Sequence, residues 1–172
     1  PILIHPDPRL KKVCDPLDVS GGVGGKLQSL IDDMLETMYE APGIGLAAPQ
    51  IGVNARLLVM DCASRDDEPP RPMALINPEV IDASESMNEH EEGCLSIPDQ
   101  YGMVSRPAEV TVRYFDREGE AQEERFAGLW ATCVQHEIDH LNGKLFIDYL
   151  GSVRRQMITQ KMKKLKRERA KA

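Results

Sequence analysis

His136-Glu137-Ile138-Asp139-His140 places two histidines four residues apart in a stretch whose pattern predicts a helix. Side chains at i and i+4 of an α-helix lie about 5–6 Å apart on one face, so two imidazoles can hold one divalent ion at about 2.0–2.1 Å. Glu137 lies next to His136 on that face, close enough to take a proton from a metal-bound water without being a ligand. The stretch therefore predicts a helix that carries a metal site with a carboxylate base beside it.

The third metal ligand has to come from elsewhere in the chain. A metzincin peptidase would have a third histidine three residues after Gly143, where this chain has Phe146. A thermolysin-like site would need a glutamate from a later helix, and only Asp148 and Glu168 follow, the latter inside a basic tail. The remaining source is one of four cysteines, Cys14, Cys62, Cys94 and Cys133.

Cys94 is the cysteine that its surroundings favour. It lies in Glu91-Glu92-Gly93-Cys94-Leu95-Ser96, where Gly93 allows the backbone to come close to a ligand and the N–H of Leu95 can face the metal. Cys94 with the two histidines would leave a fourth position for water, as in catalytic sites.

Cys133 lies three residues before His136, but it is a poor ligand. Its Cα would be about 10 Å along the axis from that of His140, at about 1.5 Å per residue, and a thiol side chain cannot span that gap. We expect Cys133 to pack in a wall beside the site, as buried free cysteines do.

The run Gly43-Ile44-Gly45-Leu46-Ala47-Ala48-Pro49-Gln50 is dense in small residues and ends in an amide. Taken alone, it is typical of a Gly/Ala-rich turn between a helix and a strand. Together with the other two stretches, it indicates backbone that lies close to a ligand.

These three blocks resemble the signatures of the peptide deformylase family. The family has a Gly-x-Gly-Leu-Ala-Ala-x-Gln run, a Glu-Gly-Cys-Leu-Ser run and a Gln-His-Glu-x-x-His helix, and this chain has them in that order at Gly43–Gln50, Glu92–Ser96 and Gln135–His140. The spacing and total length are similar to those of the bacterial enzyme, so the resemblance covers essentially the whole chain. It implies hydrolytic removal of the formyl group from the N-terminal formylmethionine of nascent polypeptides.

The resemblance also implies roles for individual residues. Cys94, His136 and His140 would bind one divalent metal ion, Fe²⁺ by resemblance, with Ni²⁺, Co²⁺ or Zn²⁺ as substitutes. Glu137 would be the acid and base, and the Gln50 amide with the Leu95 N–H would donate to the oxyanion.

Substrate contacts follow from the same resemblance. An apolar pocket for the methionine side chain would be lined by Ile44, Leu95, Leu129, Cys133 and the ring of His136, with Gly45 near the peptide backbone. Two departures affect the rim of that pocket: His90 and Tyr101 occupy positions where an aliphatic and a basic residue are expected.

Composition predicts one soluble domain over residues 1–172. The chain is 41% hydrophobic and has no apolar run of 18 residues. Pro1-Ile2-Leu3-Ile4 follows no basic segment, so no secretory signal is expected. Irregularly spaced cysteines favour free thiols in a reducing cytoplasm. We expect a cytoplasmic monomer that does not contact membranes.

Periodicity predicts an α+β fold, with mixed or antiparallel sheets around the central metal-binding helix at 129–142. Residues 26–40 have apolar side chains at helical spacing and predict an N-terminal amphipathic helix. A polar, Pro-rich surface loop is expected at Asp61–Pro72. Strands are expected at Arg56–Met60, Met73–Ile76, Val80–Ala83, Val110–Phe115 and Gln122–Phe126.

The charge is divided unevenly along the chain. Residues 1–150 carry 12 basic and 27 acidic side chains, a net charge of −15, whereas residues 151–172 carry 9 basic and 1 acidic, a net charge of +8. A basic C-terminal helix at 151–172 favours binding to phosphates, although a solvated helix attracted to an acidic body would have the same composition. With the family resemblance, we expect it to contact the ribosome near the peptide exit.

Two other functions fit the same residues. A metal-dependent aminopeptidase or related amidase could use the same ligands and would act on unformylated peptides. A ribosome-associated binding module without catalysis would have a structural metal with a closed fourth position.

Overall fold

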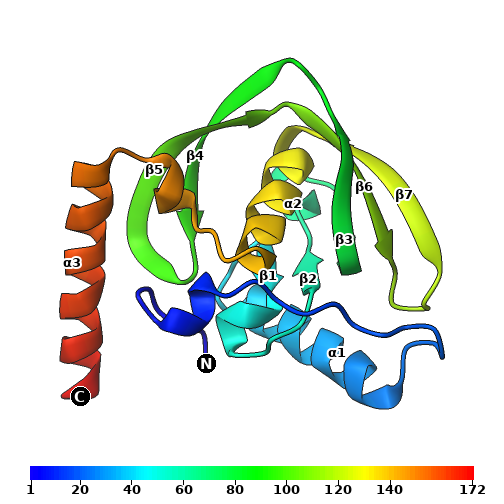
Figure 1. Ribbon diagram of the computed structural model, residues 1–172, viewed down its shortest axis with the longest axis horizontal. Coiled ribbons are helices and arrows are strands. Elements are labelled where there is room, and N and C mark those ends of the chain that lie inside the picture. The colour runs from blue at the N-terminus through cyan, green and yellow to red at the C-terminus, as the bar shows by residue number, and fades with distance from the viewer.

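A computed structural model describes residues 1–172, apart from the side chain of Asp66. Helix α2 (Gly128–Leu141) runs through the interior, and Figure 1 shows it between the hairpin β4–β5 on one side and strands β3, β6 and β7 on the other. Helix α1 (Gly25–Glu40) lies below these strands, and α3 (Ser152–Ala170) forms one edge of the molecule. The α+β class and the central position of the motif helix are confirmed.

Both sheets are antiparallel. The larger has the order β1-β2-β3-β6-β7, and the smaller is the hairpin β4–β5. The strands are β1 (Gly45–Ala47), β2 (Leu57–Met60), β3 (Met73–Ala83), β4 (Met87–Cys94), β5 (Ile97–Pro107), β6 (Glu109–Phe115) and β7 (Ala121–Ala127). Short 3₁₀ helices connect them: η1 (Pro8–Lys11), η2 (Ala48–Ile51), η3 (Ala63–Asp66) and η4 (Phe146–Tyr149).

The elements expected from periodicity are present, with two differences. The strands expected at Met73–Ile76 and Val80–Ala83 form one strand, β3, whose register with β6 is irregular around Asn77, a residue with a φ of 52°. Strands β1, β4 and β5 had not been expected: β1 lies in the small-residue run, and β4 and β5 lack the usual apolar pattern. The first five residues of β4 are all exposed, and the inward positions of β5 include Gly102 and Arg106 while Met103 points outward. Their sequences therefore lack the usual apolar alternation.

Each helix buries one face. α2 packs in a cluster with the large sheet, and α1 contributes the buried Ile31, Met34 and Met38 to a second cluster. α3 contributes the buried Ile158 and Met162 and the partly buried Leu165 to a third, beneath the hairpin. Because the buried residues of α3 are one turn apart, the helix packs on the rest of the protein through one narrow apolar face, and its other faces are exposed to solvent. None of the described helices is both long and apolar enough to cross a bilayer.

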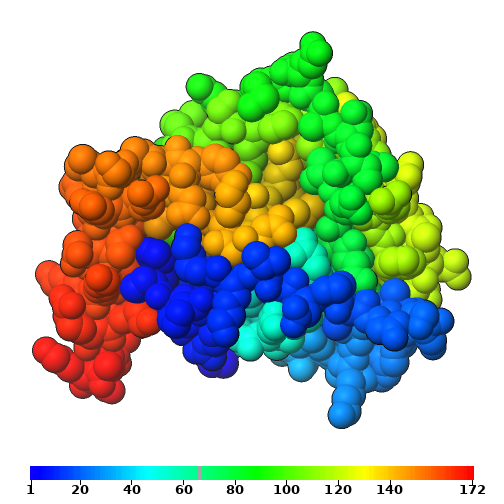
Figure 2. Space-filling model, in the orientation of Figure 1, coloured from blue at the N-terminus to red at the C-terminus, as the bar shows by residue number. Residues whose placement is uncertain are grey.

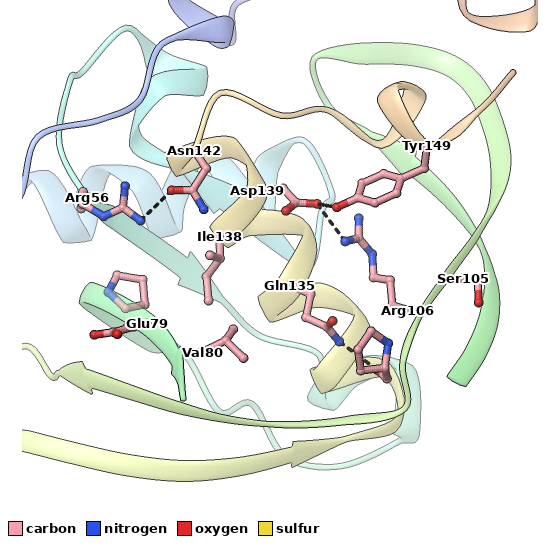
Figure 3. A pocket seen from close by; sticks show the side chains of 12 residues that line it. Arg56, Glu79, Val80, Ser105, Arg106, Gln135, Ile138, Asp139, Asn142 and Tyr149 are labelled. Atoms are coloured by element: carbon pink, nitrogen blue, oxygen red, sulfur yellow. Dashed lines mark hydrogen bonds and ion pairs between the residues drawn. The ribbon is translucent and has the colours of Figure 1, made fainter. Parts of the chain in front are cut away.

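Polar contacts fix the rotation of α2. Figure 3 shows Asp139 of α2 beside Arg106 and Tyr149: its carboxylate accepts from Arg106 Nη1 at 2.8 Å and from the Tyr149 hydroxyl at 2.8 Å. Gln135 Nε2 donates to the carbonyl of Pro107 at 3.0 Å. These bonds join α2 to β5 and η4, and so set the direction in which its histidines point.

The N-terminal segment lies beside α3, where Figure 2 shows the blue and red ends of the chain in contact. His5 Nε2 lies 2.9 Å from Thr159 Oγ1 of α3. On its other side, the N–H groups of Leu3 and His5 donate to the carbonyls of Gln50 and Ser96. The segment thus joins α3 to the two loops that flank the site described next.

Candidate metal centre

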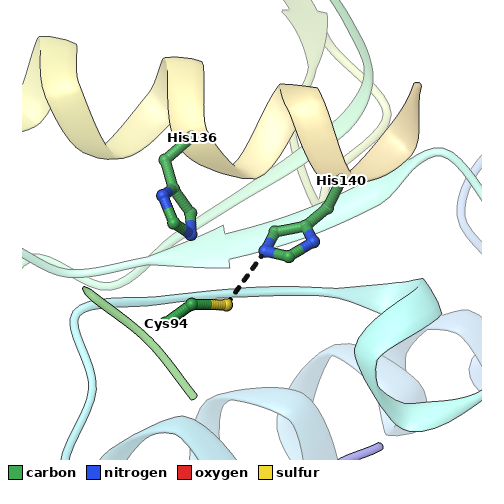
Figure 4. Close-up of side chains that lie close together, drawn as sticks. All are labelled: Cys94, His136 and His140. Atoms are coloured by element: carbon green, nitrogen blue, oxygen red, sulfur yellow. Dashed lines mark hydrogen bonds between the residues drawn. The ribbon is translucent and has the colours of Figure 1, made fainter. Parts of the chain in front are cut away.

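Cys94, His136 and His140 converge where the end of β4 meets the C-terminal half of α2 (Figure 4). One ligand atom from each lies within 4.8 Å of the others, and Cys94 Sγ is 3.4 Å from His140 Nε2. The imidazole centroids are 5.0 Å apart, as one turn of helix predicts. One thiolate and two imidazoles suit a single divalent transition metal, so these residues fit such an ion. Cys133 is not part of the group.

A buried ion-pair network supports His136. Its Nδ1 lies 2.9 Å from Glu92 Oε1, which leaves Nε2 as the nitrogen for a metal. Glu92 in turn accepts from Arg106 Nε at 2.6 Å and from Nη2 at 2.9 Å, and both residues are about 5% exposed or less. Burial raises the pKa of Glu92, but Arg106 and His136 outweigh it and lower this pKa to about 2. Glu92 is therefore ionised and holds the imidazole in one orientation.

His140 is held differently. Burial, together with His136 and Arg106, lowers the pKa of His140 well below its usual value, so its ring is neutral, the form that binds metals. Its Nδ1 is buried with no hydrogen-bond partner among the described residues. Its orientation therefore depends on packing and on what its Nε2 contacts.

Glu137 lies beside the three ligands. It is 5% exposed, and its Oε1 is 4.0 Å from His140 Nε2 with no hydrogen-bond partner in the described chain. Burial raises the pKa of Glu137 to about 7, although His136 opposes this shift. A carboxyl with such a pKa can accept and return a proton near neutral pH.

Gly45 gives Glu137 its space. A Cβ at Gly45 would lie 2.5 Å from Glu137 Oε2 and 2.8 Å from Cys133 Sγ. The small-residue run thus allows a close approach, and its nearest neighbour is the carboxylate on α2.

The amide of Gln50 has a fixed orientation. Its Oε1 accepts from the N–H of Ala47 at 2.9 Å, so Nε2 points the other way, to Ser96 Oγ at 3.1 Å and Cys94 Sγ at 3.6 Å. Gln50 is 1% exposed. A buried amide N–H₂ is therefore aimed at the ligand group, where it can donate to an oxygen that gains negative charge.

These residues face a cleft of about 1010 Å³. Of the ten residues predicted for the site, all except the deeply buried His140 line it: Gln50, Cys94, Leu95, His136, Glu137, Ile44, Gly45, Leu129 and Cys133. His90 and Tyr101 line the cleft as well, as does Arg169 from α3. The sequence blocks therefore meet in one place.

Sequence reasoning had assigned no role to Glu92, Arg106 or Ser96. Glu92 could have been found from the sequence, because it is a carboxylate in the same sequence block as Cys94, two residues before it. Arg106 is 14 residues farther along, on a strand that the apolar pattern did not reveal.

Comparisons with known proteins agree with this arrangement. The family model described as polypeptide deformylase matches residues 1–156. The peptide deformylase of Mesorhizobium japonicum is 53% identical over 170 residues, which cover 99% of this chain and 94% of that protein. A crystal structure of a peptide deformylase from Legionella pneumophila has a TM-score of 0.89 and 45% identity, covering 100% of this chain and 98% of its own. The peptide deformylase of Ehrlichia chaffeensis, solved in complex with actinonin, has a TM-score of 0.90 and 37% identity, covering 96% of each chain. On both sequence and structure, this chain belongs to the polypeptide deformylase family.

Proposed function

We propose that this chain is a metal-dependent hydrolase that removes the N-formyl group from the formylmethionine of nascent polypeptides and releases formate. Family membership supports the reaction. The observation that carries the proposal is the group of half-buried Cys94 and buried His136 and His140, which lies beside Glu137 in a cleft large enough for a peptide end. A divalent ion bound there would supply a Lewis acid that makes water easier to deprotonate.

The protein groups would do the rest of the chemistry. Glu137 would accept the proton of the attacking water and deliver it to the amine that leaves. Gln50 Nε2, together with the N–H of Leu95, would stabilise the negative charge that develops on the formyl oxygen. Ile44, Leu129 and Cys133 would surround the methionine side chain, and Gly45 would let the peptide backbone approach.

An assay with paired substrates separates this reaction from that of an aminopeptidase. The metal-loaded protein is incubated with formyl-Met-Ala-Ser and with Met-Ala-Ser, while formate and free methionine are measured. We expect formate from the first peptide and no free methionine from the second. Methionine release without formate would replace the proposal with the peptidase function.

We further propose Fe²⁺ as the metal used in the cell, with Ni²⁺, Co²⁺ or Zn²⁺ as substitutes. A thiolate and two imidazoles accept all four ions, so the family resemblance supports this choice. Metal analysis of protein purified without air and without added metal, together with rates after reloading each ion, would test it. A native preparation that contains stoichiometric zinc and is fully active would contradict it.

We also propose that α3 contacts the ribosome, and that the protein acts as a monomer in the cytoplasm. α3 carries eight Lys and Arg residues, all exposed except the half-buried Arg155, and its buried residues are Ile158 and Met162. Because only one face of α3 is buried, most of these cationic side chains are accessible to the phosphates of ribosomal RNA.

Sedimentation with ribosomes at low and raised salt tests this contact. A triple variant, Lys163→Glu, Lys164→Glu and Arg167→Glu, should lose salt-sensitive binding, whereas Lys12→Glu with Lys26→Glu should keep it. If the triple variant bound ribosomes as strongly as the Lys12 and Lys26 control, α3 would not be the contact.

A further inference from the structure

The mouth of the cleft carries an aromatic side chain, Tyr101, that the metal chemistry does not use. β5 leaves its regular pairing with β4 between Ile97 and Gly102, and Asp99 in this bulge has a φ of 61°. Pro98, Asp99 and Tyr101 all line the cleft. Bulges commonly redirect side chains next to active sites, and this one brings an aromatic ring to the rim.

The ring of Tyr101 is supported on one side and open on the other. A Cβ at Gly93 would lie 2.8 Å from Tyr101 Cε1 and 2.9 Å from Cδ1, so the ring rests against the backbone of Gly93. Tyr101 is nevertheless 53% exposed. Its carbonyl accepts a hydrogen bond from Arg154 of α3, which holds the backbone under the ring. The result is a flat apolar surface of fixed position.

This surface lies close to the reacting end of the cleft. Gly93, which supports the ring, directly precedes the ligand residue Cys94. An extended peptide advances about 3.3–3.6 Å per residue, so the residues just after the methionine are the ones within reach of Tyr101. Successive side chains of an extended peptide point in opposite directions, so one of the first two positions after methionine would face the ring.

Charge at the rim offers little alternative basis for selection. The cleft lining includes Arg65 and Arg169, but also Glu40, Glu91 and Asp99. Cations and anions are interspersed, so neither acidic nor basic peptides are strongly favoured. The aromatic ring is the distinctive feature of this rim.

We propose that Tyr101 determines specificity for formylmethionyl peptides that carry an aromatic side chain at one of the first two positions after methionine. The inference rests on the proposed deformylase function. Aromatic pairs prefer offset or edge-to-face contacts worth about 0.5–1.5 kcal/mol beyond area burial, which corresponds to a preference of roughly two- to tenfold in kcat/KM.

Two peptide series test the proposal with the metal-loaded enzyme: formyl-Met-Xaa-Ala and formyl-Met-Ala-Xaa, where Xaa is Phe, Leu, Ala or Asp. The wild type should prefer Phe to Ala in one series by roughly two- to tenfold. Tyr101→Phe should keep this preference. Tyr101→Ala should lose this preference, so that its rates for the Phe and Ala peptides become equal. Tyr101→Arg should shift the preference toward Asp.

Met103→Ala is the matched control. Met103 lies two residues along β5, is also 53% exposed and does not belong to the described cleft lining, so its loss should leave the Phe preference intact. Equal rates for Phe and Ala in the wild type, or a preference that survives in Tyr101→Ala, would overturn this inference while formate release continued. An enzyme that released no formate from any peptide would overturn the proposed function, and this inference with it.

Discussion

Gly45→Ala should inactivate the protein by moving one carboxylate. The added methyl carbon would lie 2.5 Å from Glu137 Oε2 and 2.9 Å from its Cδ, whereas nonbonded heavy atoms prefer about 3.5–4.0 Å. Glu137 must therefore shift by about 1 Å to relieve the overlap. A misplacement of about 1 Å can cost about 10²-fold in rate, or about 2.7 kcal/mol in the activation barrier. We expect kcat/KM for formyl-Met-Ala-Ser to fall by about that factor.

Metal content should stay unchanged, and the variant should still fold, although with lower stability. The ligands come from β4 and α2, so the purified variant should retain one metal ion per chain. Overpacking costs about 1–3 kcal/mol, which for a chain of this size lowers Tm by about 2–12 °C. Gly24→Ala is the control, because a Cβ at Gly24 has no atom within 4 Å.

A second substitution separates the two overlaps. Cys133→Ala in the Gly45→Ala background removes the sulfur 2.8 Å from the new methyl group, so part of the stability should return while the rate stays low. A metal-replete Gly45→Ala protein with wild-type kcat/KM would refute the reasoning, because Glu137 would then tolerate displacement.

Three further predictions concern other parts of the site and the fold. Arg106→Met leaves Glu92 buried without its guanidinium, so unfolding in denaturant should require about 3–5 kcal/mol less, and chelator competition should reveal metal affinity reduced by about 10–100-fold; unchanged values would remove Arg106 from the support of His136. Gln50→Ala should lower kcat by about 10²–10³ with metal content unchanged, and a change confined to KM would assign Gln50 to substrate binding instead. Burial, assisted by nearby lysines, lowers the pKa of His5 from 6.5 to about 4, so the folded chain binds fewer protons than the unfolded chain between these values. The contribution of neutral His5 to the free energy of unfolding should be fully present above pH 6.5 and should fall by at most about 3 kcal/mol as the pH is lowered to 4. Urea unfolding at pH 7 and 4.5 should therefore show a smaller loss of stability for His5→Gln than for the wild type. An equal loss in both proteins would contradict this prediction.

The two histidines of the candidate metal centre could be predicted because helix geometry is local. The four-residue spacing of His136 and His140 fixes their separation whatever surrounds them, and axial distance alone argued against Cys133. The wider site followed from three ordered sequence blocks. The structure brings residues of all three blocks to one cleft. The distances between these residues could not be predicted from their positions along the chain.

The remaining features depend on tertiary packing, which the pattern did not encode. The hairpin β4–β5 was missed because Arg106 occupies an inward position and Met103 an outward one. Without that hairpin, the pairing of Arg106 with Glu92 could not be anticipated. The role of Gly45 was predicted only as close approach to a ligand, because the position of Glu137 against it depends on how α2 packs over β1.

Formate release by a metal-loaded Glu137→Gln variant tests whether the Glu137 carboxylate transfers the proton in the reaction. The variant keeps the shape of the side chain but removes the carboxylate, and Glu89→Gln, on an exposed part of β4, controls for the change in charge. Both proteins and the wild type are loaded with Fe²⁺ without air, their metal content is measured, and formate from formyl-Met-Ala-Ser is followed. We expect formate from the wild type and Glu89→Gln, and at least about a 10²-fold lower rate from a metal-replete Glu137→Gln. If metal-replete Glu137→Gln released formate at the wild-type rate, Glu137 would not be the acid and base of this reaction.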